Sequence, residues 1–83
     1  MRRARVLVWL KKDVLDTQGR TINEALHGLG YDLVEDVRQG KAFDIKLDDD
    51  GVDDERLVAV LSEMSRRLLS NPVIEDYRIE LLE

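Results

Sequence analysis

The run Val6-Leu7-Val8-Trp9-Leu10 decides the fold of this chain. Its side chains are β-branched, aromatic or aliphatic, and the run is too short for a buried helix, so a β-strand is expected from Ala4 to Lys11. Successive side chains of a strand point to opposite faces of the sheet. Both faces therefore carry apolar residues and need cover: Val6, Val8 and Leu10 on one face, and Leu7 and Trp9 on the other.

An amphipathic helix is expected after this strand. Asp16 or Thr17 can cap it, because either side chain accepts a hydrogen bond from the free backbone N–H groups of the first turn. Gly30 suits the left-handed position at which many helices end. The apolar stripe of the helix recurs at three- and four-residue spacing and consists of Ile22, Ala25, Leu26 and Leu29.

The middle of the chain, between Val34 and Leu47, returns to an extended pattern. From Phe43 onward, apolar and charged residues alternate as they do on a half-buried strand. Val34 does not share the parity of Phe43, and Gly40 lies between them. We therefore expect a bulge, a bend or a tight hairpin near Gly40, and the pattern does not decide among them.

A second helix and a final strand complete the chain. Asp53 is expected to cap the helix, which has acidic residues in its first turn and Arg66 and Arg67 in its last, as the helix dipole favours. Asn71-Pro72 ends the helix, and a strand is expected from Val73 to about Leu82. The buried stripe of this helix is expected to contain Leu57, Leu61, Met64 and Leu68.

The elements follow the order strand, helix, long bent strand or hairpin, helix, strand. This order predicts an α+β fold, a two-layer sandwich with a mainly antiparallel sheet and both helices on one face. Residues 1–83 are expected to form a single domain, since a chain of this length supports one core. The other sheet face would leave Leu7 and Trp9 uncovered, so we predict that these two residues form an oligomer interface.

Composition excludes several classes of function. Hydrophobic residues make up 43% of the chain and charged residues 37%, and no apolar run approaches the roughly 20 residues that cross a bilayer. The apolar run after the basic start is too short for a signal peptide, so a cytoplasmic protein is expected. With no cysteine and a net charge of -5, the chain is expected to have no disulfide, no nucleic-acid partner and no membrane partner.

The sequence offers little material for catalysis or ligand binding. The acidic run from Asp48 to Glu55 does not fit a calcium loop, because two positions that need carboxylates fall on Lys46 and Leu57; a solvated turn before a helix cap explains the run. His27 lies near a helix end, where a hydrogen bond to carbonyl groups explains it better than catalysis does. The sequence thus predicts no catalytic residue, no cofactor-binding residue and no metal ligand.

Four segments carry a resemblance: Val14-Leu15-Asp16-Thr17-Gln18-Gly19, Ala25-Leu26-His27-Gly28-Leu29-Gly30-Tyr31, Val34-Glu35-Asp36-Val37-Arg38-Gln39-Gly40-Lys41 and Asn71-Pro72-Val73-Ile74-Glu75-Asp76-Tyr77. In this order and spacing they closely resemble the PurS family, the small subunits of phosphoribosylformylglycinamidine synthase, over nearly the whole chain. Two residues depart from the family pattern, Asp13 in place of the usual glycine and Thr17 in place of the usual proline. Both departures fall at the entry to the first helix.

The resemblance implies a role in purine biosynthesis. The synthase converts formylglycinamide ribonucleotide, ATP and glutamine to formylglycinamidine ribonucleotide, ADP, phosphate and glutamate. In the form built from several subunits, a glutaminase subunit releases ammonia and a large synthetase subunit uses ATP and magnesium. The small subunit is expected to join them as a homodimer or homotetramer, without a catalytic residue or a cofactor of its own.

Arg38, Gly40 and Lys41 are predicted to face a partner subunit, although an ordinary solvated sheet edge would explain them equally well. An alternative function stays open at this point. A small ACT-like regulatory domain binds a metabolite at a dimer interface, and here Gly40-Lys41 and the turn from Gly28 to Gly30 would line such a site.

Overall fold

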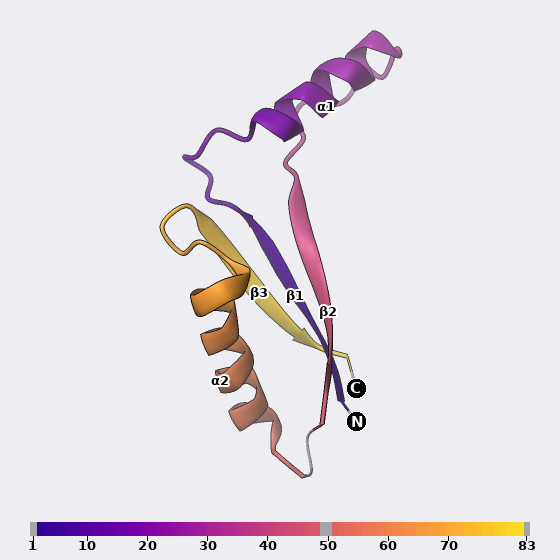
Figure 1. Cartoon of the computed structure of the whole chain (residues 1–83). Coiled ribbons are helices and arrows are strands. Elements are labelled where there is room, and N and C mark those ends of the chain that lie inside the picture. The colour runs from indigo at the N-terminus through magenta and orange to yellow at the C-terminus, as the bar shows by residue number, and fades with distance from the viewer. Residues whose placement is uncertain (1, 49–50, 83) are drawn as a thin grey trace.

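The computed structural model describes residues 2–48 and 51–82 (Figure 1). Asp49 and Asp50, in the middle of the predicted acidic turn, lie outside the described residues. The elements in chain order are β1 (Arg2–Leu10), α1 (Thr17–Gly28), β2 (Gly40–Leu47), α2 (Asp54–Met64), η1 (Ser65–Leu69) and β3 (Glu75–Leu81), where η1 is a π-helical turn that continues α2.

The three strands form one antiparallel sheet in the order β2-β1-β3, so β1 lies at its centre. Val6 faces Phe43 on β2 and Ile79 on β3, and residues paired in this way share one face of the sheet. The predicted α+β class and the antiparallel sheet are confirmed. None of the helices within residues 2–48 and 51–82 is long and apolar enough to cross a membrane.

The core lies between α2 and the sheet face that carries Val6. Its fully covered apolar residues are Ala4, Val6, Val8, Leu57 and Leu61. The predicted cap of α2 is confirmed, since the Asp53 side chain accepts a hydrogen bond of 2.8 Å from the Arg56 N–H. A hydrogen bond of 2.5 Å between the Ser62 and Tyr77 hydroxyls ties one side of α2 to β3. We call the sheet face under α2 the inner face, and the opposite one the open face.

The predicted burial of Leu68 is wrong, because 83% of that side chain is exposed. The π-helical turn places an additional residue in the last turn of the helix and so changes which side chains point toward the sheet. Ser65 takes the covered position instead, and its hydroxyl donates to the Leu61 carbonyl at 2.8 Å. Ser70 closes the wide turn with a bond of 2.8 Å from its N–H to the Ser65 carbonyl.

The expectation that both helices lie on one face holds only for α2. Helix α1 projects beyond the end of the sheet, away from the strands (Figure 1). The Cα radius of gyration is therefore 16.3 Å, whereas a compact chain of this length has about 12 Å. The molecule measures 51 × 26 × 15 Å, so it is a long, thin subunit.

The extended segment predicted from Val34 contains less strand than expected. Strand β2 begins at Gly40, and none of residues 34–39 is paired in the sheet, so a hairpin at Gly40 is not formed. The backbone N–H of Gln39 donates to the Asp16 side chain at 2.6 Å instead of to a neighbouring strand. This segment connects α1 back to the sheet.

Candidate assembly surface

The open face of the sheet carries the two residues predicted to form an oligomer interface. Leu7 is half-buried and 38% of Trp9 is exposed, and on β2 they are paired with Ala42 and Gly40. Toward the other end of the strands this face becomes charged. There Arg5 donates to Asp44 at 2.8 Å, and this hydrogen bond raises the pKa of Arg5. The open face therefore has a charged end and, around Leu7, Trp9 and Ala42, an apolar area that Asp76 and Arg78 of β3 border; we call this second end the apolar end.

A hollow of about 260 Å³ lies at the end of the strands near Trp9, and it is lined by residues of both faces, among them Trp9 and Gly40 of the open face and Lys41 of the inner face, together with Asp16. Only glycine fits at position 40, because the backbone of β1 lies so close that a Cβ atom would come within 2.6 Å of the Val8 carbonyl oxygen. Lys41 is paired with Val8, so it belongs to the inner face. Its Nζ lies 6.0 Å from the centre of the Phe43 ring.

Arg38 binds the chain itself. Its guanidinium donates to the carbonyl oxygens of Leu10, Lys11 and Val14 at 3.3, 2.9 and 3.2 Å. These carbonyls belong to the segment that leads from β1 to α1, whereas Arg38 belongs to the segment that returns from α1 to β2. The side chain thus fastens the two connections of α1 to each other.

Asp16 makes the second fastening between these connections. One carboxylate oxygen caps α1 by accepting from the Gly19 N–H at 2.9 Å, and the other accepts from the Gln39 N–H. The hydrogen bond from Gly19 is the main cause that lowers the pKa of Asp16, followed by the bond from Gln39, with a smaller contribution from the charge of Arg38. We call the group of Asp16, Gly19, Arg38 and Gln39 the elbow.

Gly19 leaves no space for a side chain in the elbow. A Cβ atom on this residue would lie 2.2 Å from the Val37 carbonyl oxygen and 2.7 Å from the nearer Asp16 carboxylate oxygen. The returning segment therefore packs directly against the first turn of α1. The direction of α1 relative to the sheet is fixed by this contact together with the hydrogen bonds of the elbow.

The stability of the elbow should depend on pH in acid. Folding lowers the pKa of Asp16. The ionised carboxylate therefore stabilises the folded chain at pH values above about 3.9, the pKa of an aspartate in an unfolded chain. This stabilisation is lost as the pH falls through the lower pKa that Asp16 has in the folded chain. We expect the difference in unfolding free energy between the natural chain and Asp16→Asn to be constant from about pH 7 to pH 5 and to shrink below about pH 4. Urea unfolding followed by Trp9 fluorescence measures this difference. A difference that stays constant down to pH 2.5, about the acid limit of such a titration, would contradict it.

His27 has a structural partner. Its Nε2–H donates to the Val34 carbonyl oxygen at 2.6 Å, and its Nδ1 lies 3.6 Å from Asp32. The predicted bond to a carbonyl near the helix end is therefore formed, although that carbonyl belongs to the following loop. Within residues 2–48 and 51–82, no group of three or more histidine or acidic side chains lies close enough to hold a metal ion.

The structure thus brings together Trp9, Gly40 and Lys41 but gives Arg38 a separate position in the elbow. The sequence identified Asp16 as a helix cap, and the structure adds the second bond of this residue to Gln39. Asp16-Thr17-Gln18-Gly19 and Arg38-Gln39-Gly40 both lie in the segments that resemble the PurS family, but the contact between them spans 23 residues.

Comparisons with known proteins agree with one another. The family model described as PurS, phosphoribosylformylglycinamidine (FGAM) synthase, matches residues 3–83. The PurS subunits of Methanocaldococcus jannaschii and Bacillus subtilis are each 42% identical to this chain; the matches cover 98% and 100% of it and 95% of each relative.

Solved structures give the same result. The crystal structure of Methanocaldococcus jannaschii PurS superposes with a TM-score of 0.89 at 40% identity, over 100% of this chain and 98% of that one. A chain in the PurLQS structure of Thermotoga maritima gives a TM-score of 0.86 at 25% identity, over 98% and 96% of the two chains. By sequence and by fold, over almost its whole length, the chain belongs to the PurS family of phosphoribosylformylglycinamidine synthase subunits.

Proposed function

We propose that this chain is the non-catalytic subunit that assembles phosphoribosylformylglycinamidine synthase, holding a glutaminase subunit and a large synthetase subunit together. The observation that carries the proposal is the match over nearly the full length to a chain of the PurLQS structure. In the assembled enzyme, ATP and magnesium would act in the large subunit. The family match also replaces the alternative of a metabolite-binding regulatory domain.

Assembly has a chemical purpose in such an enzyme. Ammonia that escapes into water at neutral pH is mostly protonated, and the ammonium ion has no lone pair with which to attack. A docked glutaminase can pass ammonia on before it meets bulk water. The proposed role of this chain is to keep that subunit docked, so that glutamine nitrogen reaches formylglycinamide ribonucleotide.

We also propose that the chain acts as a homodimer or homotetramer that uses the apolar end of its open face. Trp9 has the properties of an interface anchor, because it is large, aromatic and partly exposed beside a hollow. Leu7 extends the same apolar area along β1. Covering this area with a second copy would remove both side chains from water.

Gly40 and Lys41 are proposed to face a catalytic subunit from the edge strand β2. Lys41 is exposed at the hollow, where its charge can meet an acidic group of the partner. Gly40 supports this position through the backbone, because only a residue without Cβ allows the close approach to Val8. Arg38 would contribute indirectly, since its guanidinium holds the carbonyls of the elbow.

A reconstituted synthase tests this role. With Lys41→Ala, the glutamine-dependent rate is expected to fall about threefold to tenfold while high ammonia still supports the full rate, because only docking is weakened. The matched control is Lys12→Ala, which removes an exposed lysine outside the hollow. Arg38→Ala should lower the glutamine-dependent rate together with the melting temperature, since it breaks the elbow.

Other outcomes have clear meanings. If Lys41→Ala lowers the glutamine- and ammonia-dependent rates equally, the residue acts on the synthetase itself, and the docking role is wrong. If neither rate changes, Lys41 is an ordinary solvated residue and the docking role is also wrong. Omission of the chain from the reconstitution should abolish only glutamine-dependent synthesis, and an unchanged rate without it would contradict the assembly function.

A further inference from the structure

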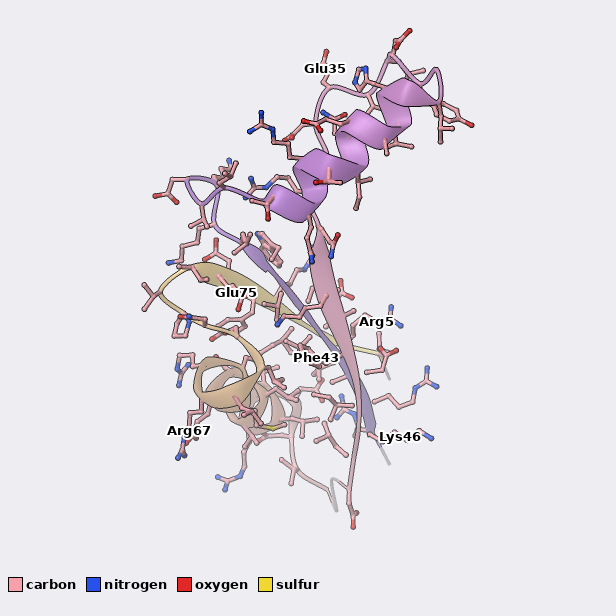
Figure 2. All side chains as sticks on the ribbon, turned by 45° about the horizontal axis from the view of Figure 1, so that its top comes forward. Arg5, Glu35, Phe43, Lys46, Arg67 and Glu75 are labelled. Atoms are coloured by element: carbon pink, nitrogen blue, oxygen red, sulfur yellow. The ribbon has the colours of Figure 1, made fainter. Side chains whose placement is uncertain are left out.

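The charged end of the open face consists of rows of side chains that cross the strands. Arg3 and Arg5 are two residues apart on β1, so both side chains lie on this face. Lys46 of β2 is directly opposite Arg3 and forms the outer row with it. The next row has Arg5 at its centre, with Asp44 on β2 and Glu80 on β3. Figure 2 shows Arg5 and Lys46 extending from the sheet on the side away from α2.

The charges of the two rows are balanced differently. Arg5 lies between two carboxylates, one on each neighbouring strand. On the other side of the outer row, the chain after β3 contributes Leu82, whose N–H donates to the Arg3 carbonyl at 2.9 Å. Within residues 2–48 and 51–82, neither Arg3 nor Lys46 has an ion pair with a carboxylate. In the part of the chain that the structure describes, the outer row therefore holds two uncompensated positive charges, although the net charge of the chain is -5.

A pair of like charges is an unfavourable choice at this position. Side chains directly opposite each other on antiparallel strands have Cβ atoms about 5 Å apart, and like charges there destabilise the sheet. A lysine on an edge strand discourages pairing with other chains, which explains Lys46 on β2. It does not explain Arg3, because β1 is the central strand. A local rule that is broken without compensation inside the chain indicates a function, so the balancing charge is expected from another molecule.

A second hollow, also of about 260 Å³, lies over this pair. Four charged side chains and one leucine line it: Arg3, Arg5, Asp44, Lys46 and Leu82. Ala4 and Ile45 also line it, and since their side chains point to the inner face, they contribute backbone to its floor. Sites that enclose a small molecule usually measure about 300 to 1,000 Å³. This hollow is smaller, so it suits a single anionic head group better than a whole metabolite.

The charge pattern favours an acidic protein segment over a free anion. A multiply charged ion such as phosphate would be attracted by the outer row but repelled by Asp44 and Glu80 in the next one. A protein segment can place a carboxylate on the outer row and a basic residue on the next, about 7 Å further along the strands. The guanidinium fork of Arg3 and the ammonium of Lys46 then share the carboxylate through charge-assisted hydrogen bonds.

We propose that an acidic segment of a catalytic subunit docks on the charged end of the open face, with one carboxylate held between Arg3 and Lys46. The inference rests on the proposed assembly function and names a further docking surface for it. Lys41, the residue already proposed to face a catalytic subunit, lies on the inner face, five residues from Lys46 and about 17 Å away along β2. The chain then has two separate docking places, as an adaptor between two subunits needs.

Binding of the full chain to each separately purified catalytic subunit, measured by biolayer interferometry, tests the inference. Lys46→Glu is the most informative variant, because a glutamate there faces Arg3 directly and Arg5 diagonally. The melting temperature should stay the same or rise. Affinity for one of the catalytic subunits should nevertheless fall about tenfold or more, since the acidic segment then meets a carboxylate. A purely structural role of Lys46 would move stability and affinity in the same direction.

Two further variants and a salt series complete the test. Arg56→Glu is the matched control, because it makes the same change of charge at an exposed residue of α2 outside the second hollow. Lys46→Arg keeps the charge and should keep the affinity of the natural chain. As the salt concentration rises from about 0.05 M to 0.5 M, binding of the natural chain should weaken much more steeply than binding of Lys46→Glu.

Three outcomes would overturn the inference. If Lys46→Glu binds both catalytic subunits as tightly as the natural chain does, this surface is wrong, while the assembly function stands, because omission of the chain decides that function separately. If the variant changes the molar mass of the isolated chain and not its binding to the catalytic subunits, the occupant is a second copy. If an excess of inorganic phosphate raises the melting temperature of the natural chain but not of Lys46→Glu, and docking is unaffected, the hollow binds a free anion instead.

Discussion

Replacing Leu61 by alanine is expected to lower the free energy of unfolding by about 3 kcal/mol. Leu61 is fully covered and packs with Ala4 and Leu57 at the centre of the core. Truncation would remove its contacts and leave a cavity under α2. A chain of 83 residues has a total stability of about 4 to 12 kcal/mol, so the loss would be a large part of the whole.

Urea unfolding at a fixed chain concentration measures the loss. Val58→Ala is the matched control, because Val58 lies on the same helix and is 40% exposed; its expected cost is below about 1 kcal/mol. Equal costs for the two variants would mean that α2 is not held by the core described above. The concentration must be held constant because association stabilises the folded chain.

Trp9→Glu is expected to shift the proposed oligomer toward smaller species at a cost of several kcal/mol. The substitution would place a carboxylate in the apolar end of the open face, next to Leu7. Asp76, which is paired with Trp9 across the sheet, would add like-charge repulsion. Light scattering measures the molar mass of the variant and of the natural chain.

Val73→Glu provides the comparison, since Val73 is 80% exposed and lies in the turn before β3. This control should keep the mass of the natural chain. An unchanged oligomer in Trp9→Glu would exclude the open face as an interface. Thermal unfolding of the variant separates dissociation from loss of the fold, because a folded smaller species still gives a cooperative transition.

Local signals in the sequence predicted most of the elements. The strand around Val8, the cap at Asp53 and the acidic first turn of α2 depend on neighbouring residues only, and the structure has all of them, while Arg66 and Arg67 lie after α2, in η1. Leu68 was predicted wrongly because the phase of a helix was extended as 3.6 residues per turn through a π-helical turn. Nothing in the residues Ser65 to Leu69 marks that turn in advance.

The position of α1 could not be predicted for a different reason. The Ile22-Leu29 stripe predicted an amphipathic helix, which is formed, but a stripe does not say where in the fold the helix lies, and Ile22 and Leu29 are exposed in this chain. That position depends on the elbow, where Asp16 and Arg38 bind segments more than 20 residues away. Long-range contacts between side chains and backbone have no short sequence signature.

The elongated shape of the chain has a consequence for the geometry of a multienzyme complex. A compact protein of this length would be about 30 Å across, but this one reaches 51 Å with the same number of residues. It can therefore touch two neighbours whose surfaces stand too far apart for a globular adaptor of equal mass. The elbow makes that reach a fixed length, so the chain can act as a spacer that sets the distance between two active sites on other polypeptides.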